Sequence, residues 1–176
     1  MIKYEKKINF QNIDQELINI FKKIESSKFP KGFLDFINYS VSELFVNIKE
    51  HSKAEIVWIK IDINMKNCFI EISDNGIGLR KSYLLKKIYP KDDFVAIEFA
   101  LSGLSTKDSQ ERGFGLYSIK KLVSVLKGEM IVESGLARII IKDNQTISQK
   151  IPKGFQGVKT ILKTSIKAFD FYKAVE

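Results

Sequence analysis

The sequence is poor in the residues that build covalent or metal-centred frameworks. Among 176 residues it contains one cysteine, Cys68, and one histidine, His51. A single cysteine excludes a disulfide within the chain, and it cannot supply the several thiolates of a metal cluster. We therefore interpret Cys68 as a small buried apolar residue.

Long apolar runs are also missing. No stretch approaches the roughly 18 apolar residues of a membrane-spanning helix, and the first ten residues, MIKYEKKINF, lack the apolar run of a signal peptide. These absences favour a cytoplasmic protein without membrane insertion. Apolar residues make up 44% of the chain and charged residues 28%, which is typical of a globular domain with a real core.

The positive net charge does not by itself indicate nucleic-acid binding. The net charge is +8, but lysines are spread along the whole chain and are interleaved with acidic residues. A solvated surface with an anionic small ligand explains this distribution as well as a nucleic-acid partner does. We therefore do not expect nucleic acid to be the partner.

Apolar periodicity divides the chain into helices and strands. Asn12 stands where it could cap the first helix. The late strands follow one another without helices between them, which predicts an α+β fold with helices on one face of a mixed sheet. We expect residues 1–31 to belong to the same unit as the main domain, 32–165, and residues 166–176 to form a tail. The expected strands are 2–10, 55–63, 68–73, 129–133, 137–142 and 157–163, and the expected helices are 12–26, 32–51, 80–88, 93–101 and 114–127.

The long helix 32–51 carries a polar face roughly a third of a turn or more away from its apolar stripe. Glu43, Asn47 and Glu50 are spaced i, i+4 and i+7, so they share one narrow face. An amide oxygen suits Mg²⁺, which needs few protein ligands, and a carboxylate one turn earlier can accept a proton from a nucleophile. The polar side of any surface helix shows the same spacing, so this pattern alone leaves both interpretations open.

A glycine loop follows the second of the two central strands. In ISDNGIGL, residues 72–79, Asp74 ends the strand and Gly76 and Gly78 follow it. The carboxylate can accept the exocyclic amine of adenine, and glycines let the backbone approach a flat ligand closely. Asn-Gly is also typical of a hairpin turn, but the next segment, LRKSYLLKKIY, has helical rather than strand spacing.

A second glycine pair precedes a helix in STKDSQERGFGLYSIKKLV, residues 105–123. Free N–H groups near Gly113 and Gly115, at the positive end of a helix, can receive phosphates. Thr106, Lys107 and Arg112 add donors in a segment, 102–112, that we expect to be mobile. A plain flexible loop remains an alternative, whereas a dinucleotide-binding fingerprint does not fit because no strand leads into it.

The three segments in this order resemble the N, G1 and G2 boxes of the GHKL family, which includes DNA gyrase, sensor histidine kinases and anti-sigma-factor kinases. The resemblance covers about residues 35–163, and GFQGVKTIL resembles the closing strand of these domains. It implies the Bergerat fold, a two-layer sandwich with a mixed, mostly antiparallel sheet, which binds ATP and Mg²⁺ between the N-box helix and a lid. By this resemblance Asp74 reads adenine, Asn47 holds Mg²⁺ and Glu43 is the catalytic base. The resemblance places the following residues around the nucleotide: Gly76, Gly78, Thr106, Lys107, Arg112, Gly113, Gly115 and Leu116.

Features of other GHKL branches that are not found in this sequence indicate which branch it resembles. His51 lies inside the N box, where it packs or caps the helix, so we do not expect a self-contained histidine kinase. We also do not expect the second domain that gyrase-like ATPases add. The layout is most similar to anti-sigma-factor serine/threonine kinases. Two functions remain open: a kinase that phosphorylates a regulatory protein partner, and a nucleotide-gated binding switch with slow or no ATP hydrolysis. A homodimer is compatible with either.

Overall fold

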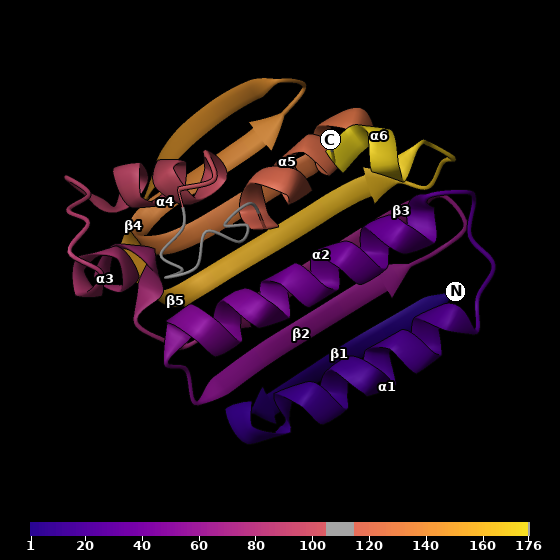
Figure 1. Ribbon diagram of the computed structural model, residues 1–176, viewed down its shortest axis with the longest axis horizontal. Helices are drawn as coiled ribbons and strands as arrows, with labels where there is room; N and C mark the ends of the chain where they lie inside the picture. Colours follow the sequence, from indigo (N-terminus) through magenta and orange to yellow (C-terminus); the bar gives the residue numbers. More distant parts are fainter. Residues whose placement is uncertain (105–114, 176) are drawn as a thin grey trace.

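The computed structural model of the chain describes residues 1–104 and 115–175 (Figure 1). One helical turn of the 3₁₀ type, Phe10–Asn12, precedes α1, and one π-helical turn, Ile48–Ser52, continues α2. The strands are β1 (Ile2–Asn9), β2 (Ile56–Ile63), β3 (Asn67–Asp74), β4 (Glu129–Lys142) and β5 (Gln145–Ser165). The helices are α1 (Ile13–Glu25), α2 (Phe33–Asn47), α3 (Gly78–Leu85), α4 (Asp93–Leu101), α5 (Gly115–Val125) and α6 (Phe171–Val175).

The five strands form one sheet in the order β1-β2-β3-β5-β4. Every pair in the described residues is antiparallel, so the parallel component of a mixed sheet is absent there. The strands bury alternate side chains: Val57, Ile59 and Ile61 of β2 lie in the core, whereas Trp58 and Lys60 are exposed. This alternation places the helices on one face of the sheet, as Figure 1 shows. The predicted α+β class is confirmed.

The last two strands are longer than the sequence predicts. β4 runs without interruption through Gly135, where its register with β5 shifts at a bulge. β5 begins at Gln145, twelve residues before the predicted start at 157. A two-residue turn with positive φ at both Asp143 and Asn144 joins the strands, as in a type I′ hairpin. The additional residues of β5 are mostly polar and exposed. Their apolar side chains, Ile147, Ile151 and Phe155, stand four residues apart, so the segment lacks the period-two apolar alternation that reveals a strand.

Two predictions at helix ends are corrected. Asn12 occupies the N-cap position of α1, but its side chain makes no capping hydrogen bond. The α-helix that contains the N box ends at Asn47, and the chain continues as the π-helical turn to Ser52 rather than as regular helix.

The C-terminal segment packs against the helices. Phe169 donates its backbone N–H to the Lys31 carbonyl at 3.1 Å, and the ring of Phe171 lies 5.8 Å from that of Tyr39 on α2. Ala174 of α6 is buried in the same core as the sheet residues. Residues 166–175 therefore extend the packed layer of helices. None of the helices in the described part of the chain is long and apolar enough to cross a membrane.

Candidate functional site

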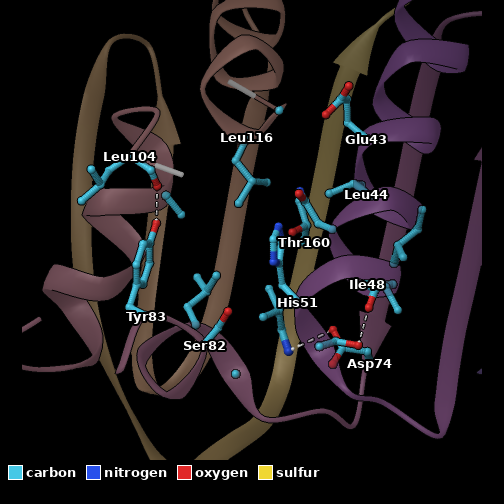
Figure 2. Close-up of a pocket in the computed structure, with 18 residues that line it drawn as sticks. Glu43, Leu44, Ile48, His51, Asp74, Ser82, Tyr83, Leu104, Leu116 and Thr160 are labelled. Atoms are coloured by element: carbon cyan, nitrogen blue, oxygen red, sulfur yellow. Dashed lines mark hydrogen bonds between the residues drawn. The ribbon is translucent and has the colours of Figure 1, made fainter. Parts of the chain in front are cut away.

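A cleft opens between α2, α3 and the first turn of α5, above strands β3 and β5 (Figure 2). Each bordering element contributes at least one side chain to its wall. Representative lining residues are Asn47 from α2, Asp74 from β3, Tyr83 from α3, Leu116 from α5 and Thr160 from β5. The cleft thus lies where the sequence places the N box beside the first glycine loop.

Asp74 is the buried acidic group of this cleft, with 1% of its surface exposed. Its Oδ1 accepts a hydrogen bond from the Gly76 N–H at 2.7 Å, and its Oδ2 accepts one from the Val158 N–H at 3.3 Å. Burial raises the pKa of Asp74 to about 6, although these two backbone bonds oppose the increase. The carboxylate is therefore ionised at neutral pH, and it keeps lone pairs beyond the two bonds it accepts.

The loop after Asp74 is fixed by side-chain and backbone hydrogen bonds and does not turn into a hairpin. The Asn75 side-chain oxygen accepts hydrogen bonds from the N–H groups of Glu55 and Ile56 at 3.0 and 2.9 Å. The Ile77 N–H donates to the Ser52 carbonyl at 2.7 Å, which joins this loop to the π-helical turn. The chain then enters α3 at Gly78, so the hairpin alternative is excluded.

Two glycines allow the backbone to pack closely around Asp74. A Cβ at Gly76 would collide with the Ser52 carbonyl oxygen. Gly157 has a φ of +85°, and a Cβ there would collide with the carbonyl oxygen of Asp74 itself. Gly76 therefore lies behind the cleft wall and shapes it without lining the cleft, whereas Gly78, with a φ of +75°, is part of the lining.

Glu43 and Asn47 both line the cleft from successive turns of α2. The first residue of α5, Gly115, lies directly against them. A Cβ at Gly115 would be 2.5 Å from the Glu43 Oε2 atom and 3.6 Å from the Asn47 Nδ2 atom. The absence of a side chain at Gly115 lets the N-terminus of α5 approach this carboxylate and amide.

Glu50, the third residue of the predicted polar face, does not line the cleft with Glu43 and Asn47. Glu50 is exposed and is absent from the cleft lining, and its Oε2 lies 3.5 Å from the Nε2 of His51. The predicted i, i+4, i+7 alignment assumes a regular α-helix, but the π-helical turn Ile48–Ser52 changes the rotation per residue before Glu50.

The other predicted residues divide into two groups. Leu116 lines the cleft together with Gly115. Thr106, Lys107, Arg112 and Gly113 lie outside the described residues, as does most of the predicted lid.

In the described part of the chain, no group of three or more His, Cys, Asp or Glu side chains could hold a metal ion. A metal at this site would depend on few protein ligands.

Several lining residues were not predicted from the sequence. Ser82 and Tyr83 line the cleft from α3, and His51 lines it from the π-helical turn. Tyr83 is 3% exposed, and its hydroxyl donates to the Leu104 carbonyl at 2.6 Å. Burial raises the pKa of the Tyr83 phenol above its usual range. The helical spacing of LRKSYLL after Gly78 was the available signal, because it places Ser82 and Tyr83 three and four residues after Leu79, which also lines the cleft.

The sequence matches one protein family, described as "Histidine kinase-, DNA gyrase B-, and HSP90-like ATPase", over residues 34–154. That span includes the N-box helix, the Asp74 loop and the start of α5. No curated protein matches the chain. The match covers more than half of the sequence and agrees with the α+β fold and the cleft. The chain therefore belongs to the histidine kinase-, DNA gyrase B- and HSP90-like ATPase family and is an ATP-binding domain of the GHKL type.

Proposed function

We propose that this protein is a cytoplasmic serine/threonine kinase that binds ATP with Mg²⁺ in the cleft and phosphorylates a regulatory partner protein. Its layout resembles that of the anti-sigma-factor kinases. One observation carries the proposal: α2 presents Glu43 and Asn47 to the same cleft that holds the buried Asp74 carboxylate. Figure 2 shows Glu43 near the upper end of the cleft wall and Asp74, from β3, near its lower end. We assign the Glu43 end to the phosphates and the Asp74 end to the adenine base.

At the base-binding end, Asp74 supplies the acceptor for the exocyclic amine of adenine. Its oxygens already accept two backbone N–H groups, which fix the plane of the carboxylate. The lone pairs that remain can accept an amine hydrogen. Because Gly76 and Gly157 have no side chains, the backbone closes around Asp74 and keeps it in this orientation. The fit supports adenine at this end of the cleft.

At the phosphate end, the donors come from α2 and from the approach to α5. The N-terminus of α5 begins at Gly115, and a helix N-terminus favours anions. We assign Lys107, Arg112, Thr106 and the N–H of Gly113 to the phosphates as additional donors.

The residues at the phosphate end also suit Mg²⁺. The Asn47 amide would hold the ion, since Mg²⁺ keeps several waters and takes most other ligands from substrate phosphates. Bound there, the ion would neutralise charge on the phosphates.

Glu43 is the general base in this proposal. The hydroxyl oxygen of a partner serine or threonine attacks the γ-phosphorus, and the hydroxyl proton passes to the Glu43 carboxylate. The bond between the γ-phosphorus and the bridging oxygen breaks, and ADP leaves with that oxygen. The position of Glu43 on the cleft wall, beside Gly115, supports this role.

The test is incubation with ATP labelled on the γ-phosphate and purified candidate partners, starting with the products of adjacent genes. The proposal predicts label on a partner serine or threonine and one ADP for each phosphate transferred. Release of free phosphate without labelling would contradict it. A partner that binds more tightly with ATP than with ADP, yet is never labelled, would favour the nucleotide-gated switch.

A further inference from the structure

The segment from Arg80 to Lys91 combines exposed apolar residues with a concentration of positive charge. Its sequence, RKSYLLKKIYPK, contains no acidic residue. Its cations are Arg80, Lys81, Lys86, Lys87 and Lys91, all of which are exposed. We call this surface the Arg80–Lys91 patch.

Three large apolar side chains of the patch face solvent. Leu84 is 41% exposed, Leu85 54% and Tyr89 74%. Burial of apolar surface is favourable, so three such side chains within residues 84–89 favour a partner that covers them. On the opposite side of α3, Ser82 and Tyr83 are buried and line the cleft. One short helix therefore has an inner face toward the cleft and an outer face toward solvent.

The patch is an ordered surface. The Arg80 guanidinium donates to the Lys91 carbonyl at 2.9 Å, which brings the two ends of the segment together. The N–H groups of Lys86 and Ile88 both donate to the Tyr83 carbonyl, at 2.9 and 3.0 Å. These bonds fix the backbone of the segment that carries the exposed side chains.

Three lysines of the patch, Lys81, Lys87 and Lys91, keep their charge unpaired within the described residues. Asp92 accepts a hydrogen bond from the Val95 N–H at 2.9 Å, and Asp93 accepts one from the Leu136 N–H at 2.8 Å, so both are engaged with backbone. Within residues 1–104 and 115–175, no ion pair involves Lys81, Lys87 or Lys91. The positive charge of these lysines is available to a partner.

We propose that the Arg80–Lys91 patch docks an acidic segment of a partner protein, with apolar side chains of that segment packing on Leu84, Leu85 and Tyr89. This inference rests on the proposed function, because the patch would supply the docking site for the partner protein that the kinase phosphorylates. The inner face of α3 lines the cleft, so a segment bound to the outer face lies across one helix diameter, roughly 10 Å, from the cleft. A membrane-surface helix presents a longer apolar face than these three side chains offer, which favours a protein partner.

The experiment uses two fluorescent 14-residue peptides, one of alternating glutamate and leucine and one with every leucine replaced by serine. Fluorescence anisotropy measures their binding to the full chain. The leucine peptide should bind more tightly than the serine peptide. The triple variant Lys81→Glu, Lys87→Glu, Lys91→Glu should weaken binding by about tenfold or more, because each reversal replaces an attraction with a repulsion. The double variant Leu85→Ser, Tyr89→Ser should remove the preference for leucine.

The matched control is Lys22→Glu, Lys28→Glu, Lys66→Glu, which changes net charge equally at exposed lysines on α1, after α1 and in the β2–β3 turn. It should alter peptide affinity by less than about twofold at moderate salt. An equal loss in the control would show a nonspecific charge effect and overturn the proposal.

Binding to vesicles with 30% phosphatidylserine without peptide binding would also overturn it, in favour of a membrane. ATP affinity, measured in parallel, should be unchanged in all variants. Peptide binding without any ATP binding by the wild-type chain would contradict the proposed function while supporting the docking site.

Discussion

The Ser134 hydroxyl donates a hydrogen bond to the Gly157 carbonyl at 3.0 Å, and it also accepts one from the Leu79 N–H at 3.0 Å. Ser134 belongs to β4, Gly157 to β5 and Leu79 to the first turn of α3. A single buried hydroxyl thus connects the sheet to the helix that forms one wall of the cleft.

The variant Ser134→Ala should lower the free energy of unfolding by about 1–3 kcal/mol, because it leaves a buried N–H and a carbonyl without their partner. ATP affinity should fall as well, since Leu79 follows Gly78 in the cleft wall. Denaturant unfolding and ATP titration measure the two effects. An unchanged free energy of unfolding would show that the hydroxyl does not hold α3 on the sheet.

The variant Gly157→Ala should impair ATP binding and stability together. The new methyl group would collide with the Asp74 carbonyl at a backbone position with φ of +85°. The strain should cost on the order of 1–3 kcal/mol and displace Asp74. Gly154→Ala is the matched control, because Gly154 also has positive φ, +66°, but its Cβ would meet its nearest atoms at 3.3 Å, away from Asp74. The control should lose some stability and keep its ATP affinity; equal ATP losses would argue against this role of Gly157.

Glu43 and Asn47 should differ in what they contribute. Glu43→Ala removes the proposed base but few contacts to bound ATP, so phosphate transfer should fall by about 10²–10⁴-fold at nearly unchanged affinity. Asn47→Ala should instead remove most of the Mg²⁺ dependence of ATP binding. Transfer assays and ATP titrations with and without Mg²⁺ separate the two. Glu50→Ala, on the exposed side of the π-helical turn, should behave as wild type. Identical binding defects at Glu43 and Asn47 would refute the division of roles.

ATP affinity should depend on pH through Asp74. The adenine amine donates to the ionised carboxylate, whose pKa is about 6 in the fold. Affinity should be constant well above pH 6 and fall by up to about tenfold for each unit below it.

The free energy of unfolding should depend on pH in the opposite direction to ATP affinity, increasing as the pH falls. The folded pKa of about 6 lies above the ordinary value of 3.8, so the protonated form stabilises the fold. This contribution is complete below pH 3.8 and is lost as the pH rises through 6. Wild type should therefore gain about 1 kcal/mol relative to Asp74→Asn between pH 7 and pH 5. Parallel pH profiles of the two proteins, in affinity or in stability, would contradict the assignment of the buried group.

The parts of the fold that carry apolar periodicity were predictable. The patterns for β1 to β3 and for the five longer helices place these elements within a few residues of their observed bounds. The first half of β5 was not predictable, since its residues are mostly exposed and depend on pairing with β4 and on the Asp143–Asn144 turn. The pairing partner is a tertiary feature that local pattern does not contain.

The candidate site was predictable where one motif positions one residue. Asp74 at a strand end and Asn47 on the N-box helix both reach the cleft. Glu50 does not, because nothing in the sequence distinguishes a π-helical turn from regular helix. Ser134 and Gly157 were missed as determinants of the site since their contacts join residues 23 and 55 positions apart in the chain. Such contacts become visible only once the sheet order is known.

The central claim is that ATP binds in this cleft with adenine on the Asp74 carboxylate. Isothermal titration calorimetry of ATP with Mg²⁺ at pH 7.5, on wild type and Asp74→Asn, tests it most directly. The asparagine amide presents a donor toward the adenine amine, and the resulting unpaired buried groups should cost about 1–3 kcal/mol. The account predicts a loss of ATP affinity of about tenfold or more in Asp74→Asn, with an unchanged circular dichroism spectrum. Equal affinity of the two proteins for ATP would contradict it.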